Sequence, residues 1–193
     1  MRKEKKNSLL TLPNIISLSR ILLVPIFLVF MIHRKITEAF VVFLLAGFTD
    51  VLDGFTARIW HQKTKIGALL DPAADKLLMT ASFIVLTIPS LNFPNIIPLW
   101  LTIVVISRDL FIVSSAFALY KLRGQKTFRP SLLGKTSTAC QVLVVLLVLL
   151  FNSIQISSPY LSLLYFSTLA FTILSGLHYS YISIRMISLP QKS

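Results

Sequence analysis

Residues 132–151 read LLGKTSTACQVLVVLLVLLF, an apolar stretch with one charge and no proline. As a helix it is about 30 Å long, which is the thickness of the hydrocarbon core of a bilayer. Five other stretches are also mainly apolar and of similar length: residues 15–32, 37–56, 69–89, 96–120 and 160–184. We therefore predict an all-α, polytopic membrane protein with six transmembrane helices. A single membrane domain is expected over residues 1–193, with a basic juxtamembrane segment at 1–14 and the six spans within 15–184.

The composition excludes several other classes of protein. Of the 193 residues, 55% are hydrophobic and only 13% are charged. Soluble domains have about 25% charged residues, so neither a water-soluble globule nor a disordered chain fits. The single cysteine, Cys140, excludes an intrachain disulfide.

The basic residues predict the orientation in the membrane. Lys and Arg number 19 against seven acids, and they gather in the N-terminal tail, the second and fourth connections and the C-terminal end. The third and fifth connections have none, and the first has only Arg34 and Lys35. The positive-inside rule then places both termini on the cytoplasmic side of an integral, multi-pass protein of the cytoplasmic membrane. The basic excess fits anionic membrane lipids, and we expect no nucleic-acid partner.

Four of the seven acids lie close together, in the stretch DVLDGFTARIWHQKTKIGALLDPAAD over residues 50–75. Asp50 and Asp53 are three residues apart and Asp71 and Asp75 are four apart, so each pair occupies one face of a helix. Four carboxylates at the cytoplasmic end of two antiparallel spans require a cation between them. Carboxylate oxygens as ligands favour Mg²⁺ or Mn²⁺, and four charges match two ions.

The residues between these aspartates suit a phosphate ester. Gly54 and Ala57 leave space beside the acids, Arg58 provides a forked donor for phosphate oxygens, and Gly67 permits a close approach of the next helix. The alternative is that the aspartates cap helices or pair with Arg58 and nearby lysines. Four acids at this spacing, with two glycines and an arginine, argue against that alternative.

The same stretch resembles the signature of the CDP-alcohol phosphatidyltransferases, D-x2-D-G-x2-A-R-x8-G-x3-D-x3-D, at every fixed position. The resemblance implies a metal-dependent enzyme that transfers a phosphatidyl group from CDP-diacylglycerol to an alcohol and releases CMP. Matching positions imply that Asp50, Asp53 and Asp71 are metal ligands, and that Asp75 is the general base and also a ligand. The CDP and diphosphate cradle would consist of Gly54, Ala57, Arg58 and Gly67. From the residues alone, Asp71 and Asp75 both remain candidates for the base.

Other segments bear on the acceptor alcohol. Residues 12–20, 67–76 and 129–136 resemble the phosphatidylglycerophosphate synthases of the family, whose acceptor is glycerol 3-phosphate. Ser107-Arg108-Asp109 and residues 176–181 resemble its cardiolipin synthases, whose acceptor is phosphatidylglycerol. We expect glycerol 3-phosphate and retain phosphatidylglycerol as the alternative, with serine or inositol phosphate more remote.

Three cations are candidate acceptor contacts: Arg108, which could also bind the diphosphate, Lys135 and Arg20. Each also has an interpretation that involves no substrate. Arg108 could pair structurally with Asp109, Arg20 could extend to the membrane interface, and Lys135 could only mark the cytoplasmic end of a helix. Small residues of the fourth span, together with the dimers that the family tends to form, make a homodimer a further expectation.

Two other classes of membrane protein also have intramembrane carboxylates or bind lipid diphosphates. A cation-coupled transporter also has intramembrane carboxylates, but it would distribute them through the membrane and would often show inverted repeats. A prenyltransferase binds a lipid diphosphate through Mg²⁺, but it gives no reason for the spacing of Gly54, Ala57, Arg58 and Gly67.

Overall fold

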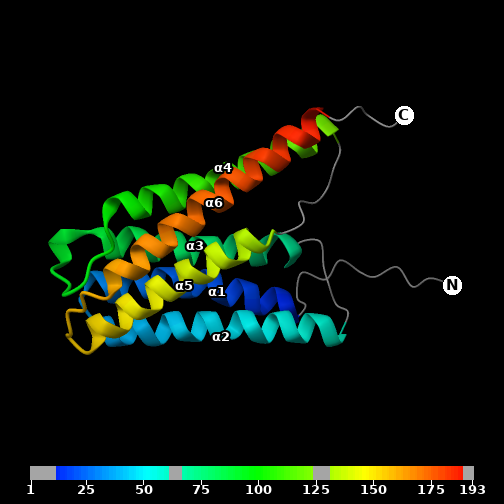
Figure 1. Ribbon diagram of the computed structural model, residues 1–193. Coiled ribbons are helices and arrows are strands. Elements are labelled where there is room, and N and C mark those ends of the chain that lie inside the picture. The colour runs from blue at the N-terminus through cyan, green and yellow to red at the C-terminus, as the bar shows by residue number, and fades with distance from the viewer. Residues whose placement is uncertain (1–11, 61–66, 124–130, 189–193) are drawn as a thin grey trace. The chain divides into compact units, whose positions relative to one another are not determined.

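The structure is a computed structural model that describes residues 12–60, 67–123 and 131–188. Side chains are described for residues 18–49, 74–117, 121 and 131–186. Within these ranges every regular element is a helix (Figure 1). The helices are α1 (Leu12–Ile32), α2 (Ile36–Trp60), α3 (Gly67–Thr87), the short 3₁₀ helix η1 (Pro89–Leu91), α4 (Leu99–Arg123), α5 (Leu132–Ser153) and α6 (Leu161–Ser188). The predicted all-α class with six long helices is confirmed.

The helices are suited to a bilayer. Among the described residues, three segments are long and apolar enough to cross a membrane: Leu99–Phe117, Leu132–Ser153 and Leu161–Met186. Large apolar side chains such as Phe48 and Leu163 point outward, with 62% and 73% of their surface exposed. A water-soluble protein would bury many of these side chains, whereas lipid tails solvate them. The chain is an integral membrane protein; six spans and cytoplasmic termini stay predictions.

The chain divides into two compact units. The first consists of Met1–Pro94 with Leu149–Ile156, and the second of Asn95–Val148 with Ser157–Ser193. In the first unit α1 packs against both α2 and α3, and in the second α4 packs against α6. The single domain over residues 1–193 stays a prediction.

The core of the first unit is built from one face of each helix. On α1, Phe27 and Met31 are one turn apart and fully buried. On α2, Ala39 and Ala46 are also fully buried, and the ring of Phe43 between them lies 6.3 Å from that of Phe27. Small side chains at a helix interface let two backbones approach, and the aromatic pair fills the remaining space. This packing fixes α1 beside α2 along their length.

Backbone hydrogen bonds close two of the connections tightly. After α1, Lys35 N–H donates to the Phe30 carbonyl at 2.9 Å, and Arg34 has a left-handed φ of 58°. After α5, Ile156 N–H donates to the Phe151 carbonyl at 2.9 Å, and Gln155 has a φ of 57°. This is the Schellman arrangement, in which a left-handed residue satisfies the last carbonyls of a helix. Both helices therefore end abruptly.

Candidate functional site

The aspartate motif occupies two helix ends of the first unit. Asp50 and Asp53 lie near the C-terminus of α2, and α3 begins at Gly67 and carries Asp71 and Asp75 in its first turns. Figure 1 shows the C-terminus of α2 and the N-terminus of α3 at the same end of this unit. Each aspartate pair is therefore helical and one turn apart, as the spacing predicts. The side chains of Asp50, Asp53, Gly54, Ala57, Arg58, Gly67 and Asp71 lie outside the described residues.

Asp75 is the one motif aspartate whose side chain is described. It is half-buried and directly follows Ala74, a fully buried residue of the first unit. Half-burial leaves part of the carboxylate accessible, which is compatible with the general base that the resemblance implies. Among the residues with described side chains, no three His, Cys, Asp or Glu lie together as a metal site. The metal ligands stay a prediction, and the two helix ends are compatible with it.

Arg20 lies in α1, on the same unit as the aspartates. Its side chain is only 1% exposed, so it does not extend to the membrane interface as one interpretation of the sequence allowed. α1 packs against α3, and both begin at the end of the unit where the motif lies (Figure 1). Arg20 and Asp75 are each eight residues beyond the first residue of their helix. A buried positive charge needs negative groups around it, so the position of Arg20 is compatible with a site that binds an anion.

Arg108 is the centre of a polar cluster in the second unit. Its Nη1 donates to Asp109 Oδ1 at 2.8 Å, and its Nη2 donates to the Ser175 hydroxyl at 2.5 Å. The guanidinium carbon lies 5.8 Å from the centre of the Tyr179 ring, within the range of a cation–π interaction. Arg108 is 8% exposed and Ser175 is fully buried. The ion pair that the sequence left open does form, although the two residues are adjacent on α4.

The ion pair leaves part of the guanidinium unused. An arginine has five N–H donors. In Arg108, Nη1 and Nη2 each donate one hydrogen bond to a described residue. The Nε of Arg108 is buried and has no hydrogen-bond partner among the described residues. A buried donor without a partner costs about 1–3 kcal/mol. An oxyanion is the partner that a guanidinium binds best, because carboxylate and phosphate oxygens match its fork.

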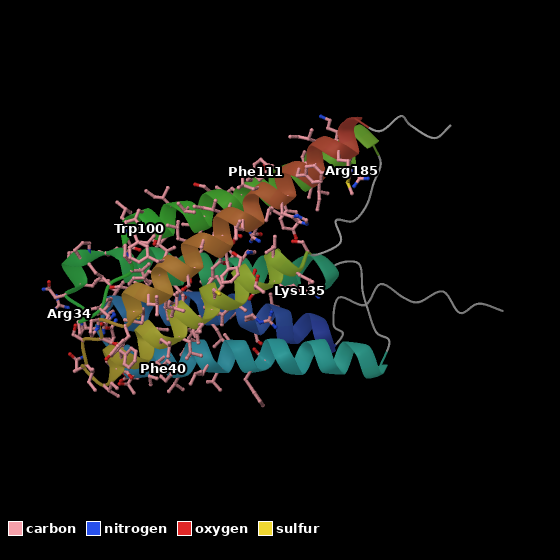
Figure 2. All side chains as sticks on the ribbon, viewed as in Figure 1. Arg34, Phe40, Trp100, Phe111, Lys135 and Arg185 are labelled. Atoms are coloured by element: carbon pink, nitrogen blue, oxygen red, sulfur yellow. The ribbon has the colours of Figure 1, made fainter. Side chains whose placement is uncertain are left out.

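Lys135 lies in the first turn of α5, with its side chain exposed (Figure 2). The turn is capped by the Ser131 hydroxyl, which accepts the Gly134 N–H at 3.0 Å. Serine is a preferred N-cap residue because its oxygen satisfies one of the free N–H groups of the first turn. The cap fixes the backbone at Lys135, while its exposure is compatible with both interpretations of this lysine.

Two residues of this cluster were not among the sequence-predicted site residues. Ser175 and Tyr179 lie on α6, one turn apart, and both contact Arg108. The available signal was the run of residues 175–181 in α6, where hydroxyl groups recur in an apolar span. A buried arginine in the fourth span requires acceptors from some other helix, but the sequence does not say which helix faces it.

The chain belongs to the CDP-alcohol phosphatidyltransferase family, which it matches over residues 10–174. Relatives within the family carry two different names. The CDP-diacylglycerol–glycerol-3-phosphate 3-phosphatidyltransferase of Bacillus subtilis is 34% identical over 185 residues, which cover 87% of this chain and 92% of that protein. The cardiolipin synthase (CMP-forming) of Rattus norvegicus is 36% identical over 151 residues, which cover 70% of this chain and 48% of that protein. A human cardiolipin synthase (CMP-forming) is 35% identical over the same length.

The two groups of relatives differ in how much of their length is matched. The chain spans about half the length of the animal cardiolipin synthases. It spans nearly all of the Bacillus subtilis protein. The match confirms the family that the aspartate motif predicts. The relatives carry the names of both activities, in parallel with the mixed features of the sequence.

Proposed function

We propose that this chain transfers a phosphatidyl group from CDP-diacylglycerol to glycerol 3-phosphate, giving phosphatidylglycerophosphate and CMP. The observation that carries the proposal is the nearly end-to-end match to the Bacillus subtilis protein that bears the name of this activity. The buried Arg108 supports it, because a small phosphate-bearing acceptor would supply the oxyanion that its unused donors lack.

A divalent metal site is part of the proposal. Asp50 and Asp53 on α2 and Asp71 and Asp75 on α3 would hold Mg²⁺ or Mn²⁺, with two ions matching the four charges. The support comes from the backbone, in which the members of each pair are one helical turn apart and both pairs lie at the same end of the first unit. The ions would neutralise the diphosphate and the leaving CMP.

The chain's own residues would perform the remaining steps. Asp75 would accept the proton of the acceptor hydroxyl as its oxygen attacks the phosphorus of the phosphatidyl group. Gly54, Ala57, Arg58 and Gly67 would form the cradle for the CDP and diphosphate. Arg108, Lys135 and Arg20 would bind the phosphate of the acceptor. Catalysis would then consist mainly of orientation and charge stabilisation.

The membrane orientation follows from the same proposal. CDP-diacylglycerol is a lipid whose nucleotide extends into water, so the aspartates belong at the membrane surface. The basic residues place that surface on the cytoplasmic side of a multi-pass protein. In intact cells, a cysteine introduced in the N-terminal tail should not react with a membrane-impermeant maleimide. It should react once the cytoplasmic membrane has been permeabilised.

A cardiolipin synthase is the second candidate. The cardiolipin synthase relatives have slightly higher identity, 36% and 35%, over a shorter match. That activity would require a second lipid, phosphatidylglycerol, to reach the site. The deciding experiment is an acceptor panel with CDP-diacylglycerol and Mg²⁺ or Mn²⁺, comparing glycerol 3-phosphate, phosphatidylglycerol, serine and inositol phosphate by CMP release. We expect the fastest release with glycerol 3-phosphate. No release with any acceptor would refute the activity.

A further inference from the structure

Tyr179, on α6, contacts Arg108 on α4 and the N-cap residue of α5. Its ring covers the guanidinium of Arg108 on α4, at 5.8 Å from ring centre to carbon. Its hydroxyl accepts the backbone N–H of Ser131, the N-cap residue of α5, at 3.2 Å. Tyr179 is 6% exposed, so both contacts are made away from solvent. One side chain of α6 therefore joins a buried cation on α4 to the first turn of α5.

The sequence of α5 leaves room for this tyrosine. A Cβ atom added at Gly134 would lie 2.9 Å from the Tyr179 hydroxyl oxygen and 3.1 Å from the ring carbon Cε2. The shorter distance is below any that real Cβ atoms show, so any larger residue at position 134 displaces the tyrosine. Gly134 is helical and needs no unusual backbone angle there. Its lack of a side chain therefore serves the approach of Tyr179 to the α5 terminus.

We propose that Tyr179 is a positioning residue for the acceptor phosphate, because it holds Arg108 and the first turn of α5, which carries Lys135, in one fixed arrangement. The proposal rests on the function proposed above and names a residue that sets the acceptor affinity of the same site. Ser175 and Asp109 fix the plane of the guanidinium by two hydrogen bonds, and the Tyr179 ring covers one face of it.

The physical effect is preorganisation. An arginine held in one rotamer loses little conformational entropy when it binds an anion, so affinity rises without any new contact. The ring also excludes solvent from one face of the cation, which strengthens its attraction to phosphate. In this proposal the cluster binds the phosphate of the acceptor and not CDP-diacylglycerol. A defect at Tyr179 should therefore change the KM for the acceptor and leave the KM for the lipid donor unchanged.

The first test is Tyr179→Phe in the full-length protein, in detergent with CDP-diacylglycerol micelles. Phenylalanine keeps the ring over Arg108 and removes only the hydroxyl that accepts the Ser131 N–H. We expect the KM for glycerol 3-phosphate to rise about two- to tenfold, the range that loss of one hydrogen bond gives. Tyr181→Phe is the matched control, since Tyr181 lies on the same helix and is 62% exposed. It should leave both KM values unchanged.

The second test uses the space at Gly134. Gly134→Ala should raise the acceptor KM at least as much as Tyr179→Phe, because the added methyl group meets both the hydroxyl and the ring of Tyr179. The double variant G134A/Y179F should be little worse than Gly134→Ala alone, because the methyl group has already displaced the hydroxyl from the Ser131 N–H. Multiplicative effects would show that the two residues act separately and would overturn the proposal. An unchanged acceptor KM in Tyr179→Phe would do so too, as would loss of folded protein, which would mark the hydrogen bond as purely structural. A wild-type protein that releases no CMP would instead refute the proposed function.

Discussion

Replacing Arg108 by methionine tests whether this buried cation binds substrate or only joins two helices. Methionine keeps the apolar bulk of the arginine stem and removes the guanidinium. The variant loses the bonds to Asp109 and Ser175 and leaves the Asp109 carboxylate, 13% exposed, without the guanidinium. Breaking a buried ion pair from one side costs about 3 kcal/mol or more. In a chain of 193 residues, that cost lowers Tm by roughly 6–12 °C.

The double variant R108M/D109N separates stability from binding. Asparagine removes the carboxylate charge at nearly constant volume, so most of the lost Tm should return. Turnover should not return if Arg108 contacts a phosphate oxygen. A hydrogen bond from a charged group contributes about 1.5–3 kcal/mol, which corresponds to a loss of about 10- to 100-fold in kcat/KM for the acceptor.

The assay is CMP release against glycerol 3-phosphate concentration, with Tm measured on the same detergent preparations. Arg185→Met is the control, since Arg185 is an exposed arginine near the end of α6. It should alter neither quantity. A double variant R108M/D109N with both the wild-type Tm and the wild-type kcat/KM would refute the reasoning and leave Arg108 a structural residue.

Three further predictions concern the first unit. Asp75→Asn should lower kcat by about 10²–10⁴-fold while CDP-diacylglycerol binding stays measurable; a normal rate would exclude Asp75 as the base. Chelation by EDTA should stop CMP release and added Mg²⁺ or Mn²⁺ should restore it, whereas activity that survives dialysis against EDTA would contradict a metal site. Phe27→Ala should lower the free energy of unfolding by about 3–5 kcal/mol, because Phe27 is fully buried against Phe43. Its Tm should fall accordingly, whereas Leu22→Ala, at a position 60% exposed, should scarcely change Tm.

The positions of the helices could be predicted from hydropathy, but not their ends. A segment that crosses lipid must satisfy its own backbone, so a long apolar run predicts a helix reliably. α2 nevertheless continues to Trp60, past the end predicted at residue 56, because helical hydrogen bonds persist through polar residues beyond the apolar layer. α4 begins at Leu99 and not at residue 96, since Pro98 disfavours the helical conformation of the residue that precedes it.

The site could be predicted only where its residues are close in sequence. The Asp50–Asp75 motif is one continuous run of sequence, so its spacing alone places the two pairs on consecutive helices. The contact between Arg108 and Ser175 spans 67 residues and depends on how α6 is rotated against α4. Hydropathy does not predict which face of α6 is turned toward α4, because α6 has apolar side chains around most of its circumference. The burial of Arg108 was therefore predictable, and its partners on α6 were not.

The adjacency of Arg108 and Asp109 has a consequence for biogenesis. Ribosomes add roughly 5–20 residues per second, so Ser175, 67 residues later, is made several seconds after Arg108. During that interval α4 carries an arginine that would be costly alone at the centre of a bilayer. Asp109 is already present on the same helix and accepts its Nη1–H. We therefore expect Asp109 to neutralise the charge of the nascent helix before its final partners on α6 have been synthesised.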